Sequence, residues 1–364
     1  MLNTLLPILL FAALALAVIG AGKRFLMWRR GRPSRVDWLG GLLAMPRRYM
    51  VDLHHVVARD KYIANTHVAT AGGFVLAAVL AIVVHGFGLH SRILGFALLA
   101  ACALMFGGAL FVAKRRLDPP SRLSKGPWMR LPKSLLMFSV SFFIATLPVA
   151  GILPADFGGW VLALLLTVGV AWGVSELFFG MTWGGPMKHA FAGALHLAWH
   201  RRAERFGGGR STGLKPLDLN DPQAPLGVEK PKDFTWNQLL GFDACVQCGK
   251  CEAACPAFAA GQPLNPKKLI QDMVVGLAGG TDAKFAGSPY PGKAIGEHAG
   301  NPHQPIVNGL VDAETLWSCT TCRACVEECP MMIEHVDAIV DMRRHLTLEK
   351  GATPNKGAEV LENL

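Results

Sequence analysis

The sequence predicts an all-α protein in which a membrane domain of five spanning helices precedes a cysteine-rich helical domain. Hydrophobic residues make up 51% of the 364 residues, and the long apolar runs all lie before residue 181. Charge divides the chain in the same way: residues 1–233 carry 26 Lys and Arg against 11 Asp and Glu, whereas residues 234–364 carry 10 against 15. A basic half beside anionic lipid and an acidic half in solution fit this division.

The five predicted spans are apolar runs long enough to cross the hydrocarbon core of a bilayer. They lie at residues 4–22, 69–89, 92–113, 134–153 and 157–180. The first run is not a cleaved signal peptide, because its positive charges follow it instead of preceding it. The basic residues flank apolar runs and form no stripe with interleaved aromatics, which argues against nucleic-acid binding.

The loops between these runs predict one orientation. Residues 23–66, 114–133 and 181–206 hold ten, seven and four Lys and Arg, whereas the two opposite loops hold only Arg92 and Asp156. The positive-inside rule therefore places the N-terminus outside and the cysteine-rich domain in the cytoplasm of a bacterial inner membrane. Residues 45–66 are predicted to form an amphipathic helix at the lipid interface.

The composition divides the chain into three segments. Residues 1–206 form the membrane domain, and residues 207–233, rich in Gly and Pro without an apolar period, read as a flexible linker. Residues 234–364 form the cysteine-rich domain. Within it, helices are predicted from Asn265-Pro266 to about Val275, just before Cys319, and over 331–349.

Two cysteine runs carry the chemistry of this domain. They are Cys245-Val-Gln-Cys-Gly-Lys-Cys-Glu-Ala-Ala-Cys-Pro256 and Cys319-Thr-Thr-Cys-Arg-Ala-Cys-Val-Glu-Glu-Cys-Pro330. Each has the C-x2-C-x2-C-x3-C-P spacing, in which three thiolates bind one [4Fe-4S] cluster and the fourth ligates the cluster of the other run. Two runs therefore predict two clusters.

The crossed rule divides the eight cysteines into two sets. The first cysteine set is Cys245, Cys248, Cys251 and Cys329, and the second cysteine set is Cys319, Cys322, Cys325 and Cys255. Structural zinc is the first alternative, but zinc sites use two C-x2-C knuckles that are farther apart. Disulfides, the second alternative, need an oxidising compartment. The 63 residues between the runs favour the helical type of two-cluster ferredoxin domain.

Ionisable residues inside apolar runs are functional candidates. His67 and His85 are 18 residues apart, which is five turns of an α-helix, so they share a face with one near each membrane surface. A haem b at the inner surface could use His67 with His189, whereas at the outer surface His85 has no partner on a facing helix; interfacial histidines without haem are the alternative. Glu176 is a candidate for a proton or quinone-headgroup role, and snorkelling is its alternative.

A further set of histidines follows the fifth span. His189, His196 and His200 recur at spacings of seven and four residues, which places them on one helix face. Such a face suits ligands, but an ordinary amphipathic helix has one too. No Ser-His-Asp set, phosphate loop or nucleotide-binding GxGxxG motif accompanies them.

The segment Leu316–Arg344 around the second run, with Leu264–Leu269, resembles the iron–sulfur part of the heterodisulfide-reductase-related family. The N-terminal half resembles nitrate-reductase gamma-type membrane cytochromes, although the outer His of their fifth span is missing here. The combination is similar to the membrane-bound iron–sulfur B proteins of dimethylglycine catabolism, which take electrons from electron-transfer flavoprotein. These relatives continue into Cys-rich repeats, whereas no Cys follows Cys329.

The resemblance implies an electron-transfer component of an oxidoreductase. A soluble flavoprotein, either electron-transfer flavoprotein or a flavin-dependent demethylase, would reduce one cluster, and membrane quinone would accept the electrons. Oxidation of dimethylglycine to sarcosine would be the upstream reaction. Two alternatives stay open: a relay from quinol to a cytoplasmic reductase, and a membrane anchor with structural clusters.

Overall fold

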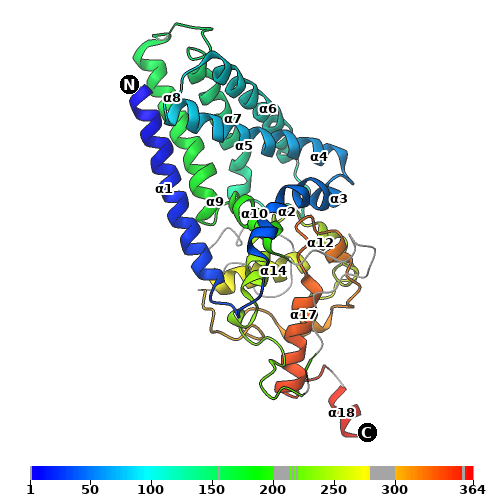
Figure 1. Ribbon diagram of the computed structural model, residues 1–364. Helices are drawn as coiled ribbons and strands as arrows, with labels where there is room; N and C mark the ends of the chain where they lie inside the picture. Colours follow the sequence, from blue (N-terminus) through cyan, green and yellow to red (C-terminus); the bar gives the residue numbers. More distant parts are fainter. Residues whose placement is uncertain are drawn as a thin grey trace. The chain divides into compact units, whose positions relative to one another are not determined.

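The computed structural model describes residues 2–154, 156–200, 214, 217–218, 220–278, 300–354 and 357–363 (Figure 1). These residues form helices and no β-strand, which confirms the all-α prediction for this part of the chain. Isolated β-bridges pair Arg32 with Thr235 and Val307 with Val311. The chain divides into two compact units.

The first unit comprises Met1–Arg24, Val57–Pro120 and Gly126–Lys188. Its helices are α1 (Leu2–Trp28, of which the last four residues belong to the second unit), α4 (Lys61–His67), η2 (Val68–Gly72), α5 (Gly73–Ala81), η3 (Ile82–Gly86), α6 (Arg92–Leu117), α7 (Pro127–Thr146), α8 (Gly159–Val174), η4 (Ser175–Phe179) and α9 (Gly180–Thr182). Small residues let them pack closely, as membrane helices do. A Cβ at Gly108 would clash with Thr70 Oγ1, and one at Gly173 would lie only 2.8 Å from Phe138 Cβ.

Four helices of the described chain are long and apolar enough to cross a membrane. They are Thr4–Trp28, Lys61–Gly86, Arg92–Leu117 and Gly159–Thr182. The predicted fourth span at 134–153 differs, because α7 begins at Pro127 and ends at Thr146. The helix therefore includes Arg130 and Lys133, and Pro148 lies in the turn that follows it. α7 packs against both α6 and α8, but the count of five spans is not confirmed.

The second unit comprises Phe25–Val56, Ser121–Lys125 and His189–Leu364. Its helices are α2 (Trp38–Arg47), η1 (Arg48–Leu53), α3 (His54–Val57), α10 (Lys188–Trp199), η6 (Pro231–Asp233), α11 (Trp236–Asp243), α12 (Lys250–Ala253), α13 (Pro256–Ala259), α14 (Pro266–Ala278), α15 (Ala313–Trp317), α16 (Ala324–Glu327), α17 (His335–Arg344), η8 (His345–Glu349) and α18 (Gly357–Glu362). The helices predicted before Cys319 and over 331–349 are present. Segments 25–56, 121–125 and 189–200, assigned to the membrane domain from sequence, belong to this unit.

Part of the predicted linker is packed instead of flexible. The N–H of Val228 donates to Asp341 O at 3.0 Å, and Arg32 Nη2 donates to Gly227 O at 2.9 Å. Pro231 is buried at the start of η6. The Gly-rich stretch 207–213 lies outside the described residues, so the linker prediction is wrong only for the segment from Gly227 to Asp233.

Candidate metal centre

The two cysteine loops have the same backbone conformation. In the first, Gln247 and Gly249 have φ angles of 51° and 69°; in the second, the equivalent Thr321 and Arg323 have φ angles of 56° and 64°. Left-handed residues at alternate positions turn successive N–H groups to one side, which makes an anion-binding concavity. Both loops thus have a backbone suited to an anionic cluster.

Backbone N–H groups point at thiol sulfurs in both loops. The N–H of Gln247 is 3.4 Å from Cys245 Sγ, that of Thr321 is 3.3 Å from Cys319 Sγ, and that of Ile333 is 3.5 Å from Cys329 Sγ. Hydrogen bonds to ligand sulfurs stabilise the anionic cluster and tune its reduction potential. The donors therefore fit the cofactor predicted for these residues.

The fourth Cys of each run lies with the three thiols of the other run. Cys329 interacts electrostatically with Cys245 and Cys248. Cys255 interacts in the same way with Cys319 and Cys325. This arrangement supports the crossed division into the first and second cysteine sets, and iron ligation by these residues remains a prediction.

The thiols need a cation to become ligands. Burial raises the pKa of Cys325 to about 12 and that of Cys251 well above its usual range, and neighbouring thiols raise both further. Iron would supply the missing positive charge, since metal binding releases the thiol protons.

The spacing of the thiols also bears on the zinc alternative. Thiolates around one zinc ion would be about 3.8 Å apart at Zn–S distances of ~2.3 Å. In the described chain no group of three or more His, Cys, Asp or Glu is arranged to hold one metal ion. The described residues therefore give no support to the zinc alternative.

The first cysteine loop is held by the segment Ser121–Lys125. The Arg122 guanidinium donates to Cys248 O, and Ser124 Oγ donates to Gln247 Oε1 at 2.7 Å. A Cβ at Gly249 would lie 2.6 Å from Arg122 O, so this contact requires glycine as well as a left-handed backbone. From sequence, residues 114–133 indicated membrane orientation only, and no sequence signal indicated this contact.

A buried ion pair completes the support of the first loop. Lys267 Nζ lies 3.2 Å from Glu252 Oε2 and donates to Arg122 O at 2.7 Å. Both charged side chains are almost fully buried. Lys267 thereby ties α14 to α12 and to the 121–125 segment, and it lines a small cavity with the first cysteine set.

The second cysteine loop is held by α17. Arg323 donates to Glu334 Oε2 at 2.7 Å and to Asp337 Oδ1 at 2.9 Å. Arg343 donates to Cys319 O at 2.6 Å from the same helix. The two loops thus share a backbone but have different supports.

Exposure separates the two cysteine sets. Cys245, Cys251 and Cys329 of the first set are buried, and Cys248 is half-buried. In the second set Cys322 is exposed and Cys319 is half-buried. In the described part of the chain the second set therefore has a fully exposed cysteine, whereas the first set has none.

Two candidate residues of the membrane domain, Glu176 and His85, take part in ordinary structural contacts. Glu176 in η4 pairs with Arg130 at 3.2 Å. His85 Nε2 is 2.9 Å from Thr146 Oγ1, whose own proton goes to Phe142 O at 2.6 Å, so His85 donates and its Nε2 is not free to bind iron. Outer-haem ligation through this nitrogen is therefore disfavoured.

Haem ligation by the inner pair, His67 and His189, stays a prediction. His67 lies in the first unit and His189 in the second. The shared face of His67 and His85 rested on an uninterrupted α-helix, but π-helical turns η2 and η3 lie in this stretch. Each π turn inserts extra backbone, so 18 residues no longer equal five turns.

Comparison with known proteins agrees with the cysteine geometry. Residues 3–222 match a family described as a domain of unknown function, DUF3483, and residues 241–333 match the 4Fe-4S dicluster domain. The chain belongs to the DUF3483 family. The dicluster match supports [4Fe-4S] clusters as the cofactors of this DUF3483 protein.

Three relatives show where the likeness lies. A probable membrane-anchored ferredoxin of Chromohalobacter salexigens is 74% identical over 373 residues, covering all of this chain and 56% of that protein. EtfAB:quinone oxidoreductase of Syntrophomonas wolfei is 41% identical over 149 residues, 38% of this chain and 21% of that protein. An iron-sulfur subunit of the CoB--CoM heterodisulfide reductase of Methanopyrus kandleri is 27% identical over 143 residues, 39% of this chain and 58% of that protein.

The DUF3483 chain thus spans about half the length of the first of these relatives. No solved structure matches it.

Proposed function

We propose that this protein is a membrane-anchored, ferredoxin-like carrier that passes electrons from a soluble flavoprotein to membrane quinone. The difference in exposure between the two cysteine sets carries the proposal, because Cys322 is exposed whereas Cys245, Cys251 and Cys329 are buried. When bound, the two clusters would each accept and release one electron. The chain would receive electrons at the exposed loop and deliver them from the covered one.

The relatives support both ends of this route. One is an EtfAB:quinone oxidoreductase, and a second is a probable membrane-anchored ferredoxin. Electron-transfer flavoprotein is therefore the proposed donor, and dimethylglycine oxidation to sarcosine is the proposed upstream reaction because of the resemblance of the cysteine segments. The two cysteine sets are the proposed ligands.

The proposed setting is a bacterial inner membrane with the cysteine domain in the cytoplasm. It requires five crossings, and hence that α7 spans the bilayer although it carries Arg130 and Lys133. Its packing between α6 and α8 supports this, since both neighbours qualify as spans. Glu176 with Arg130 would then lie near the inner surface.

The test uses the purified full chain in liposomes that contain ubiquinone-10. Electron-transfer flavoprotein, reduced beforehand, is added outside, and flavin oxidation and cluster absorbance are followed together under anaerobic conditions. We expect the clusters to be reduced first and quinone next. Reduced clusters with no quinol formed would overturn the acceptor, and clusters that dithionite reduces but this flavoprotein does not would overturn the donor.

The likeness to the heterodisulfide reductase iron-sulfur protein favours a second function, a relay in the opposite direction from quinol to a cytoplasmic reductase. The two directions of electron flow require different reduction potentials of the clusters relative to the quinone pool. Redox titration of the clusters decides between them: potentials well above that of the quinone pool would favour the reverse relay.

A further inference from the structure

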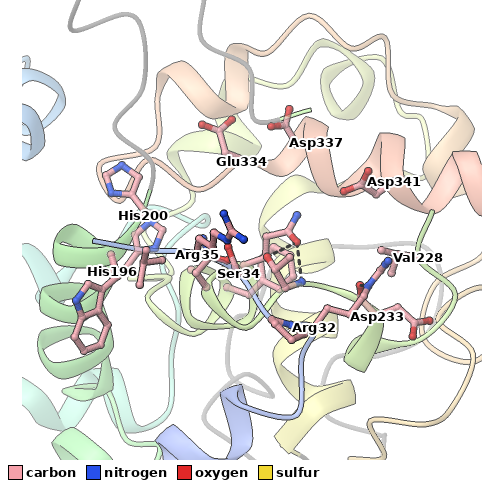
Figure 2. Close-up of a pocket in the computed structure, with 18 of the residues that line it drawn as sticks. Arg32, Ser34, Arg35, His196, His200, Val228, Asp233, Glu334, Asp337 and Asp341 are labelled. Carbon is pink, nitrogen blue, oxygen red and sulfur yellow. Dashed lines mark hydrogen bonds between the residues drawn. The ribbon is translucent and has the colours of Figure 1, made fainter. Parts of the chain in front are cut away.

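A cavity of about 820 Å³ lies within the second unit, apart from the space between the cysteines (Figure 2). Its walls come from the segment Arg32–Gly41, α10, α11 and the stretch from Met332 to Arg344. Figure 2 shows His196 and His200 together on one side and Glu334, Asp337 and Asp341 on another. The volume falls in the range of pockets that bind organic ligands of about 300–1,000 Å³.

The two histidines in this wall are buried and unsatisfied. His196 is 5% exposed and His200 is 8% exposed, with ring centroids 4.7 Å apart. By strict hydrogen-bond geometry none of their four ring nitrogens has a partner in the described part of the chain, although the Met331 backbone lies close to the His196 ring and the His196 and Leu197 backbones lie close to the His200 ring. Buried polar groups are nearly always paired, so four unpaired atoms beside one cavity point to a ligand.

Burial lowers the pKa of both imidazoles, which favours their neutral form. Burial lowers the pKa of His196 to about 4, and the positive charge of Arg48 lowers it further. Each ring therefore offers one N–H donor and one acceptor nitrogen. By contrast, buried His335 is satisfied, since its Nδ1 lies 2.8 Å from Ile333 O.

One residue joins this cavity to the first cysteine set. Ile333 lines the cavity and also lines the small space among Cys245, Cys248, Cys251 and Cys329. Its N–H points at Cys329 Sγ. A redox-active ligand in the cavity would therefore be one side chain away from the covered cluster.

Helix α2 lies against α10 in the wall of the cavity. α2 contributes Gly40 and Gly41 to the cavity. On its outer side, Leu39 is 69% exposed and Leu43 is 74% exposed, and α2 follows a candidate span that ends at Trp28. An exposed apolar face on a helix that follows a span in the sequence favours a position in the lipid interface, and hence a ligand from the bilayer.

We propose that this cavity binds the headgroup of a membrane quinone, with His196 and His200 donating hydrogen bonds to one of its carbonyl oxygens. The proposal rests on the function proposed above. Reduction would take two electrons, which the proposed clusters would supply one at a time after reduction by the flavoprotein, and two protons from water relayed by the imidazoles. Both carbonyls become hydroxyls, and the product is quinol.

A metal ion on the two histidines is the alternative occupant. Residues four apart on one helix can chelate a metal. Among the described residues, however, no third His, Cys, Asp or Glu completes such a site. The cavity is also far larger than an ion needs, and Trp199, Phe242 and Ile333 add apolar surface to its charged lining.

The test measures binding as well as turnover. The full chain in detergent is titrated with decylubiquinone while tryptophan fluorescence is followed, because Trp199 lines the cavity and lies 4.7 Å from Trp38 between ring centroids. In parallel, an azido-ubiquinone is photolysed on the protein and its adducts are mapped by mass spectrometry. We expect adducts on α10 or the 332–334 segment, and binding about tenfold weaker in His196→Leu and in His200→Leu.

The matched control is His303→Leu, since His303 is exposed and is not in the cavity wall. Both cavity variants should keep the wild-type melting temperature or exceed it, because they remove unsatisfied polar atoms. Wild-type binding in both variants, or adducts only in the membrane helices, would refute this site even if quinone reduction continues. Stoichiometric Zn²⁺ binding that needs both histidines, with no effect of quinone, would also refute it. Binding and labelling as expected without quinol formation would refute the proposed function instead.

Discussion

The ion pair beneath the first cysteine loop allows a quantitative prediction. Lys267 is fully buried and lies 3.2 Å from Glu252, which is 6% exposed. At an effective dielectric constant of about 20, two unit charges at this distance attract by about 5 kcal/mol. Much of this offsets their desolvation, but removing one partner alone typically costs ~3–5 kcal/mol. Lys267→Met should therefore lower the melting temperature of the protein by about 10 °C.

The assay is thermal unfolding of anaerobically prepared full-length protein, followed by circular dichroism and by cluster absorbance. A second change, Glu252→Gln, should restore most of the loss in the double variant because no charge is then left unpaired. A double variant as unstable as Lys267→Met would show that the pair does not account for the effect.

The neighbouring Lys268→Met is the matched control for cluster chemistry. Lys268 is also buried and pairs with Asp272 at 2.6 Å, but it does not line the space around the first cysteine set. Both variants should lose stability, whereas only Lys267→Met should lower the potential of the covered cluster, because it removes a positive charge beside an anionic cofactor. Equal shifts in both variants would refute the placement of that cluster.

Three further predictions follow from the loops and the spans. Cys255→Ser should reduce iron from about eight to roughly four per chain, and electron paramagnetic resonance should show that the cluster of the other run is the one lost. Gly249→Ala should abolish the first cluster, because its Cβ would meet Arg122 O. The control Gly261→Ala, at φ +76° in open space, should lower the free energy of unfolding by only about 1 kcal/mol in melting experiments. Topology reporters in 23–66 should be cytoplasmic and those in 147–158 outside; a cytoplasmic signal from 147–158 would mean that α7 does not cross.

Local features of the fold were predictable from the sequence because the sequence encodes them locally. The helix that begins at Pro266 follows from the proline, and the division of cysteines follows from a fixed spacing. The π turns between His67 and His85 were not predictable, because π turns carry no clear signature in apolar sequence. Burial of His196 and His200 could not be predicted either, since their shared face gave no information about what covers it.

Long-range contacts were the least predictable part. Arg122 reaches Cys248 across 126 residues, and Arg32 reaches Gly227 across 195. Basic residues between apolar runs satisfy the positive-inside rule whatever else they touch, so composition assigned both arginines to orientation alone. The same ambiguity made the segment from Gly227 to Asp233 read as a linker, because Pro and Gly also occur where a chain without regular structure packs closely.

One position accounts for the different supports of the two cysteine loops. At the second left-handed site the first loop has Gly249 and the second has Arg323. Glycine leaves room for Arg122 to lie against the first loop and close it, whereas the arginine uses its guanidinium to bind Glu334 and Asp337. The second loop is thereby fixed to α17 from one side, and Cys322 stays exposed on the other. In the proposed route, a difference of one side chain between the repeats would thus separate the loop that accepts electrons from solution from the loop that delivers them inside the protein.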